Sequence, residues 1–336
     1  MEIVLLTQST LDEQVQVYCS AFEKGSSFEV IKAHWVKKHY KNPIENSLIF
    51  GAFDGDRLIG LNAYLPSIYR VGEKKYYVLQ SCESGVLPAY RGKGVWSKIV
   101  RFAVEYISNN TRYEGIMGFP NYRNSYPGFK KMGWNTLYQM DNYLLVNNAS
   151  KFAESIFGGN SVLGFVAGLA VMQRIPIFVF SLFQNRYQIR ECFVNEALWN
   201  IPDEPALTID HSEAWCKWKA DYKQLRCLLI NKSGEPLASC IYGIDMYEGH
   251  EVIRLDQFSN NGRTHGSRRL LSLALAYLKK RYPNAAFVRT WTMPRDGRIF
   301  RKLMFIKSSH PNPFILIDTK GNLKDLRWSL SFFDLD

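Results

Sequence analysis

The stretch Gly85-Val-Leu-Pro-Ala-Tyr-Arg-Gly-Lys-Gly-Val95 decides how this chain is interpreted. It follows a run rich in Tyr, Val and Leu that is typical of a β-strand, and it precedes residues whose apolar positions recur at helical spacing. The glycines on either side of Lys93 allow positive φ angles and close approach of a ligand to the backbone. A strand, a glycine-rich turn and a helix N-terminus together direct several N–H groups at one point. The stretch therefore predicts a pyrophosphate site, to which Arg91 and Lys93 add charge.

Apolar periodicity on both sides of this stretch predicts alternating helices and strands. In the first half we expect helices over 11–22 and 28–39, strands over 48–53, 58–65 and 76–84, a helix from 95, a strand over 115–118, a short helix over 129–132 and a strand over 137–146. In the second half we expect strands over 228–231, 237–242 and 252–258, a helix over 268–281, a strand over 286–291, a short helix over 298–304 and a strand over 314–318. The order predicts a mixed α/β (α+β) fold with a hairpin at Asp54-Gly55-Asp56.

Two landmarks of the first half recur in the second at nearly the same offset. Arg91-x-x-Gly94 is matched by Arg263-x-x-Gly266, 172 positions later, and Phe129-Lys-Lys-Met-Gly-Trp134 by Phe300-Arg-Lys-Leu-Met-Phe305, 171 positions later. Two pairs at almost equal separation indicate an internal duplication. We therefore expect one domain over 1–147, an apolar helical connector over 148–185 and a second domain over 186–336.

A second element completes the pattern of the first half, namely Gly118-Phe-Pro-Asn-Tyr-Arg-Asn-Ser-Tyr-Pro-Gly-Phe-Lys-Lys-Met-Gly-Trp134. Together with Val86-Leu-Pro-Ala-Tyr-Arg-Gly-Lys-Gly94 it resembles the acetyl-coenzyme A (acetyl-CoA) loop, and the strand and helix that follow it, of the GNAT N-acetyltransferase superfamily. The second half looks like a degenerate copy with one glycine in Arg263-Thr-His-Gly266, and with Asp256 and His265 near that loop. The resemblance implies tandem GNAT-like domains, each a mixed, mostly antiparallel sheet flanked by helices, the second structural or acceptor-binding.

The resemblance implies an acetyltransferase that uses acetyl-CoA as acyl donor, without a metal, by direct attack of an acceptor amine on the thioester. The backbone at Val86 and Leu87 is expected to pair with the pantetheine arm, and the Val86 N–H to polarise the thioester carbonyl. The backbone from Gly92 to Ser97 is expected to hold the pyrophosphate. The full set of donor-binding residues that the resemblance implies is Val86, Leu87, Arg91, Gly92, Lys93, Gly94, Val95, Trp96, Ser97, Asn121, Asn124 and Ser125.

Three positions depart from the family pattern. Trp96 replaces the usual third small residue of the loop, Gln80 stands where a glutamate base is common, and Phe129 stands where a tyrosine acid is usual. The nearest substitutes are Glu83 as base and Tyr126 as acid. Three residues along a strand place Glu83 on the opposite face from Gln80, unless a bulge intervenes. These departures keep open an inactive GNAT-like binding or scaffold module as the alternative.

Composition bounds the class of partner. The 336 residues carry a formal net charge of +11, which suits a nucleotide cofactor, an anionic lipid or a nucleic acid. No basic stripe interleaved with aromatics forms a recognisable nucleic-acid module, so we expect no nucleic acid. The six cysteines lack metal-ligand spacing and are expected to be reduced thiols. Without a signal-peptide pattern at the N-terminus, we expect a cytoplasmic protein.

The segment 156–183 leaves a question about membranes. It holds two apolar runs separated by Gln173 and Arg174, with Pro176 just beyond, and neither run reaches the ~20 residues that span a bilayer. It fits a packed connecting helix or peripheral contact with the inner face of a membrane. The acceptor is expected to be a small-molecule or glycan amine, for example an amino sugar of surface-polysaccharide synthesis, and a homo-oligomer is possible. Aromatic residues of the second half fit either sugar-binding surfaces or core packing, namely Trp215, Trp218, Tyr242, Tyr247 and Trp291.

Overall fold

The fold comes from a computed structural model, and the described residues are 1–22, 27–159, 162–182, 184–199, 202, 204–261, 266–309 and 311–335. Arg263 and His265 of the second-half loop, and Phe183 at the end of the apolar segment, lie outside these residues. All six cysteines are free thiols.

The helices and strands of the first half follow the expected order. They are β1 (Glu2–Leu6), α1 (Leu11–Phe22), α2 (Phe28–His39), β2 (Leu48–Asp54), β3 (Arg57–Val71), β4 (Lys74–Val86), α3 (Val95–Asn110), β5 (Gly115–Gly118), α4 (Tyr126–Lys131) and β6 (Asn135–Val146). The connector contains α5 (Ala149–Phe157) and α6 (Leu163–Ser181). The second half contains β7 (Gln188–Cys192), β8 (Thr208–Ile209), α7 (Glu213–Lys223), β9 (Arg226–Lys232), β10 (Glu235–Tyr247), β11 (His250–Asn260), α8 (Ser267–Arg281), β12 (Phe287–Thr292), α9 (Arg298–Lys302), β13 (Ile306–Lys307) and β14 (Asn312–Asp318).

The central hairpin is longer than the periodicity predicts. β3 and β4 pair from Gly60 opposite Val86 to Val71 opposite Lys74, and the pairing continues past Pro66 of β3. The predicted Asp-Gly hairpin joins β2 to β3, with Gly55 at a φ of +59°. The strands β1, β7 and β8 are absent from the sequence-based expectation, because short or half-exposed runs carry little period-2 signal.

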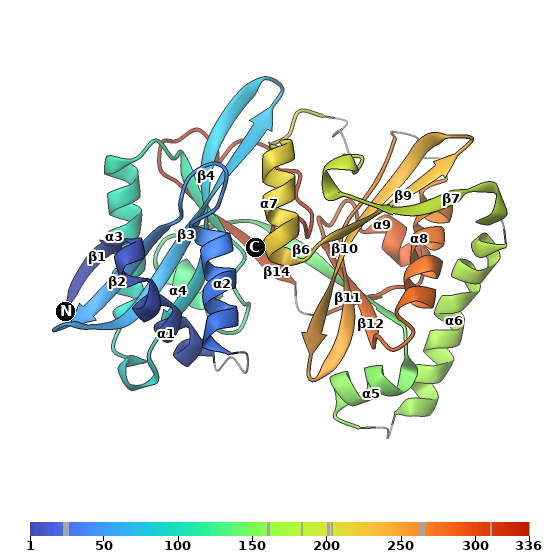
Figure 1. The fold of residues 1–336 in the computed structure, drawn as a ribbon, viewed down its shortest axis with the longest axis horizontal. Coiled ribbons are helices and arrows are strands. Elements are labelled where there is room, and N and C mark those ends of the chain that lie inside the picture. Colours follow the sequence, from blue (N-terminus) through green and yellow to red (C-terminus); the bar gives the residue numbers. More distant parts are fainter. Residues whose placement is uncertain are drawn as a thin grey trace.

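The described strands form one mixed sheet in the order β1-β2-β3-β4-β5-β14-β6-β12-β11-β10-β9-β7, with β13 beside β6 and β8 beside β3. Figure 1 shows the two halves side by side, α7 between them and α6 along the outer edge of the second half. The predicted α/β class with helices flanking a mixed sheet is confirmed.

The two halves exchange their last strands. β14, the last strand of the second half, pairs with β5 of the first half, while residues 141–146 of β6 pair with β12 of the second half. β14 also pairs with residues 135–140 of β6, which joins the halves into one sheet. Backbone hydrogen bonds therefore cross the boundary expected at residue 147.

The aromatic residues suggested as sugar-binding surfaces mostly fill the core. Trp215, Trp218 and Tyr242 are buried. Trp291 stacks on Phe332 with ring centroids 4.5 Å apart, and only Tyr247 belongs to the exposed surface. Of the two alternatives, core packing therefore holds for the three buried side chains, because a ring without exposed surface offers no face to a sugar.

Candidate active site

An opening in the sheet lies at the carboxyl end of β4. β5 pairs with β4 only from Val78 to Ser81, although β4 continues to Val86. Residues 82–86 therefore have β3 on one side and no β5 partner on the other. Such an unpaired edge can accept an extended ligand as an added strand.

Hydrogen bonding separates the two residues expected to meet the pantetheine arm. The Leu87 N–H donates to the Ile59 carbonyl at 2.9 Å, and the Leu87 carbonyl accepts from the Tyr90 N–H at 2.9 Å. The Leu87 N–H is therefore used within the fold, but its carbonyl oxygen has a second lone pair, so the pairing of Leu87 with the pantetheine arm stays a prediction. Backbone groups of successive residues in an antiparallel strand point alternately to its two edges, so those of Val86 point away from β3. On that side the Val86 carbonyl accepts a hydrogen bond from Arg91 Nε at 3.3 Å. The Val86 N–H thus faces the opening.

The predicted anion loop has the backbone geometry that its glycines allow. Gly92 and Gly94 both have a φ of +74°, and α3 begins directly after Gly94. The Lys98 N–H donates to the Gly94 carbonyl at 3.1 Å, so the N–H groups of the residues between them lie before the first intrahelical bond. Those residues are Val95, Trp96 and Ser97. The loop therefore presents the N–H groups and dipole that suit a pyrophosphate.

The basic residues of the loop have different roles. The Arg91 guanidinium donates through Nη2 to the Ala21 carbonyl at 3.0 Å, near the end of α1, and so braces the loop. Lys93 is exposed and its Nζ lies 5.2 Å from the centroid of the Tyr90 ring. Gly85 of β4 allows α1 to approach this strand closely, because a Cβ on Gly85 would lie 2.9 Å from the Cβ of Ala21. Lys93 therefore keeps its charge at the surface of the loop, whereas Arg91 is bound to backbone carbonyls.

Glu83 lies at a bulge in β4. The β3–β4 register shifts between Leu61 and Ala63, so Glu83 and Ser84 oppose a single residue, and Glu83 has a φ of +40°. The bulge turns the Glu83 carboxylate toward α2, where Lys38 Nζ forms an ion pair with it and His39 Nε2 lies 3.4 Å away. The structure thus supplies the bulge that the sequence alone could not reveal.

The environment of Glu83 fixes its charge. Burial raises the pKa of Glu83, but Lys38 and His39 outweigh burial and hold that pKa well below its usual range. The carboxylate is ionised at neutral pH and its side chain is 11% exposed. His39 is fully buried, and its Nδ1 lies 2.9 Å from Ser47 Oγ.

The sequence did not single out Lys38 and His39, because two basic residues at the end of a helix are common. Together with Cys82, the Glu83–His39 pair places three potential metal ligands within 4.8 Å of one another. The Lys38 ammonium against the carboxylate disfavours a cation there, so we assign no metal.

Trp96 and Phe129, the two bulky residues that depart from the family pattern, pack against each other. The Trp96 ring lies 4.9 Å from that of Phe129, which in turn lies 4.7 Å from that of Trp134. A Cβ on Gly128 would approach the Trp96 ring to 2.5 Å. Trp96 therefore fills the space between α3 and α4, over a glycine that leaves room for it.

The remaining predicted residues lie in the turn before α4. The Asn121 Oδ1 accepts from the N–H groups of Arg123 and Asn124 at 3.0 and 3.2 Å, so this side chain shapes the turn. Asn124 is exposed and Ser125 is the half-buried N-cap residue of α4.

Tyr126 contacts β6 through its hydroxyl. Its hydroxyl lies 3.0 Å from Thr136 Oγ1 on β6, and β6 is separated from β5 by β14. The role of Tyr126 as the acid therefore stays a prediction.

The second half has an equivalent opening that the chain itself fills. β11 pairs with β12 only at Ile253 and Arg254 before the strands diverge. The segment 329–335 enters the gap, where the Phe333 N–H donates to the Asp256 carbonyl at 3.0 Å and Ser331 bridges to Thr292 on β12. The C-terminal segment thus occupies the edge that corresponds to the open edge of β4.

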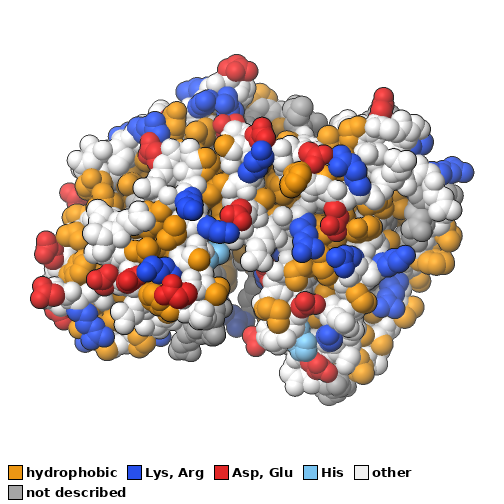
Figure 2. Space-filling view, viewed as in Figure 1, with side chains coloured by type: hydrophobic (Ala, Val, Ile, Leu, Met, Phe, Trp, Pro, Cys, Tyr) orange, Lys and Arg blue, Asp and Glu red, His pale blue; other side chains and the backbone are white. Residues whose placement is uncertain are grey.

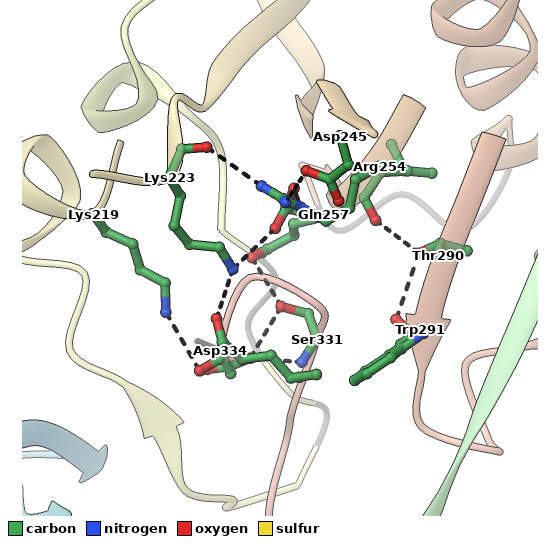
Figure 3. Close-up of polar contacts among 12 residues, drawn as sticks. Lys219, Lys223, Asp245, Arg254, Gln257, Thr290, Trp291, Ser331 and Asp334 are labelled. Atoms are coloured by element: carbon green, nitrogen blue, oxygen red, sulfur yellow. Dashed lines mark hydrogen bonds and ion pairs between the residues drawn. The ribbon is translucent and has the colours of Figure 1, made fainter. Parts of the chain in front are cut away.

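Figure 3 shows the polar contacts around this filled opening. Asp256 lies at the register shift of β11, as Glu83 does in β4, and accepts from Arg254 Nε at 2.8 Å. Lys223 Nζ lies 3.6 Å from the same carboxylate, and Lys219 Nζ donates to the Asp334 carbonyl at 3.3 Å. The Asp256 carboxylate is completely buried, so no acceptor can reach it.

Comparison with known proteins agrees with this geometry. Residues 2–137 match the acetyltransferase (GNAT) domain family. The matched residues belong to the first half, which carries the open edge of β4 and the glycine loop. No protein with curated annotation matches it in sequence.

Three solved structures with the same fold cover almost the whole chain. A probable N-acyltransferase from Enterococcus faecalis V583 is 10% identical, with a TM-score of 0.59 over 95% of this chain and 73% of that one. A GCN5-related N-acetyltransferase from Anabaena variabilis is 12% identical, with a TM-score of 0.57 over 95% and 72%. One from Kribbella flavida is 14% identical, with a TM-score of 0.58 over 94% and 70%. At this identity the likeness shows the fold alone.

Proposed function

We propose that this protein is an acetyl-CoA-dependent N-acetyltransferase of the GNAT type. One observation carries the proposal: the unpaired edge of β4 ends in a glycine loop at the N-terminus of α3, with an ionised glutamate at a bulge beside it. This arrangement offers one surface for an extended arm, one for a pyrophosphate and one carboxylate for an amine.

The chain's own groups suggest how acetyl transfer would proceed. Acetyl-CoA supplies the thioester, and the Val86 N–H is the backbone donor that would polarise its carbonyl. The ionised Glu83 carboxylate would accept a hydrogen bond from the neutral acceptor amine, and it would receive the one proton that the nitrogen loses as it attacks. His39 lies behind the carboxylate and would orient it. The attack forms the amide C–N bond and expels the thiolate.

The acceptor side is built partly by the second half. α7 packs on α2 through Trp218 Nε1, which donates to the Lys37 carbonyl at 2.7 Å, and through an ion pair between Lys37 and Asp221. α2 also carries the two residues that hold Glu83. We propose that the acceptor is an amine of a small molecule or glycan, such as an amino sugar.

Release of free coenzyme A tests the proposal. Purified protein with acetyl-CoA is mixed with amino sugars, polyamines or peptides, and thiol release is followed with and without each amine. We expect amine-dependent release with one class of acceptor and a loss of at least ~100-fold in Glu83→Gln, because general-base catalysis contributes that much. Glu29→Gln, at an exposed position of α2, is the matched control.

A second candidate function is a GNAT-like binding module without turnover. Phe129 in place of a tyrosine, and the engagement of the Tyr126 hydroxyl by Thr136, favour it. Acetyl-CoA binding without thiol release across all three acceptor classes would support this candidate and contradict the enzyme.

A further inference from the structure

The connector helix α6 exposes an apolar face along its whole length. Only 22% of the residues Leu163–Phe180 are buried, and among the described helices α6 is the one that is long and apolar enough to cross a membrane. Exposed apolar side chains follow one another along this face, namely Phe165, Val171, Met172, Ile175, Phe178, Val179 and Leu182. Contiguous apolar surface of this kind marks an interaction site.

The opposite face of α6 is part of the protein core. Val166, Ala170 and Ile177 are buried there at helical spacing. Gln173 is fully buried between them and accepts from the Val146 N–H at 2.8 Å while donating to the Met304 carbonyl at 2.9 Å. Because this face is committed to the protein, α6 can lie along a bilayer but does not cross one.

Charge identifies the partner of the exposed face. The sequence from 155 to 190 contains three arginines and no Asp or Glu, and α8, which packs beside α6, contains basic residues and no acid either. Arg268 and Arg269 of α8 lie over the Phe180 ring, at 5.1 and 6.0 Å from its centroid. Arg174 and Arg268 form no ion pair with the described residues. Figure 2 shows hydrophobic and basic side chains together on the right-hand side of the molecule, over α6 and α8.

We infer that α6 is a peripheral membrane-binding helix that lies in the surface of an anionic bilayer. The exposed apolar side chains enter the boundary between headgroups and acyl chains, and the arginines beside them meet lipid phosphates. At a rise of 1.5 Å per residue the 19-residue helix is about 28 Å long, which gives a continuous contact.

Vesicle co-sedimentation of the full chain tests the inference. Vesicles of phosphatidylglycerol and phosphatidylcholine are compared with vesicles of phosphatidylcholine alone, at low and high salt. The variant V171Q/I175Q/V179Q, called the stripe variant, replaces three exposed apolar residues of α6 by glutamine, which is a good helix former. The control V30Q/F193Q/M246Q replaces equally exposed apolar residues elsewhere. A further variant, R268E/R269E, reverses the adjacent charge.

We expect the wild type and the control to bind the anionic vesicles, with weaker binding at high salt. The stripe variant and the charge-reversal variant should each bind at least tenfold more weakly, with unchanged circular dichroism. No binding of the wild type to anionic vesicles would overturn the inference. Equal binding of the stripe variant would also overturn it. So would a lipid-free dimer in size-exclusion chromatography that the stripe variant dissociates, because α6 would then be a protein interface.

Discussion

Glu83 combines three features that together define its role: a left-handed φ at a bulge, nearly complete burial and two basic neighbours. Removal of one partner from a buried ion pair leaves the other charge without compensation, which costs more than the pair itself contributes. The same carboxylate is therefore expected to affect both stability and activity, and the two effects must be measured separately.

Glu83→Gln is expected to lower the free energy of unfolding by about 3 kcal/mol, because buried Lys38 loses its carboxylate. The double variant Lys38→Met/Glu83→Gln should be more stable than the single variant, with a coupling of about 2 kcal/mol. Urea denaturation of the four proteins in the cycle measures both quantities. Additive effects would show that the ion pair does not form in solution.

The pH dependence of stability follows from the same carboxylate. The folded-state pKa of Glu83 is lower than its unfolded value near 4.5, so its contribution is present above pH 4.5 and is lost as the pH falls below that value. The free energy of unfolding should therefore fall more steeply between pH 5 and pH 3 in the wild type than in Glu83→Gln. Parallel curves would contradict the depressed pKa.

At the residue scale, the sequence predicts the loop but not the proton-transfer site. The positive φ of Gly92 and Gly94 and the start of α3 at Val95 follow from local residue types. The bulge at Glu83 and its contacts with α2 depend on how β3 and β4 pair, and pairing register is not written in any single segment. Leu87 shows the same limit, because its N–H partner is 28 positions away on β3.

At the element scale, α3 and α4 are fitted to each other through an unusual pair. Trp96 occupies a position where the family has a small residue, and Gly128 on α4 leaves room for its ring. The sequence revealed each departure separately, but only the packing shows that the indole faces α4.

Gly128→Ala is expected to lower the free energy of unfolding by about 1–3 kcal/mol, because its Cβ would meet the Trp96 ring at 2.5 Å. In the background of Trp96→Ala the same substitution should cost less than about 0.5 kcal/mol. Thermal denaturation of the four proteins measures the difference. Gly159→Ala, where a Cβ has no neighbour within 4 Å, is the control. An equal cost in both backgrounds would show that the ring does not limit the site.

At the scale of the whole molecule, the exchanged strands make the halves interdependent. The duplicated landmarks indicate two copies of one domain. The order of elements along the chain cannot show that β14 of the second half pairs with β5 of the first, or that β6 of the first half pairs with β12 of the second. β14 lies between β5 and β6, so residues 1–147 alone lack a central strand.

The fragment 1–147 is therefore expected not to unfold cooperatively when expressed alone, because β5 and β6 would lack the strand between them. Co-expression with 148–336 should restore a folded complex. We would compare the fragment, the complex and the intact chain by near-UV circular dichroism and by thermal denaturation. A cooperative, native-like fragment would contradict the importance of the exchange.

The central claim is that the open edge of β4 and the loop after it bind acetyl-CoA, whereas the filled opening of the second half does not. Hydrogen exchange with and without acetyl-CoA tests this most directly, with Gly94→Trp as the variant that blocks the loop. We predict slower exchange in residues 82–97 of the wild type, no change in residues 253–260 of β11, and no protection in the variant. Unchanged exchange over 82–97, or protection of β11 instead, would contradict the account.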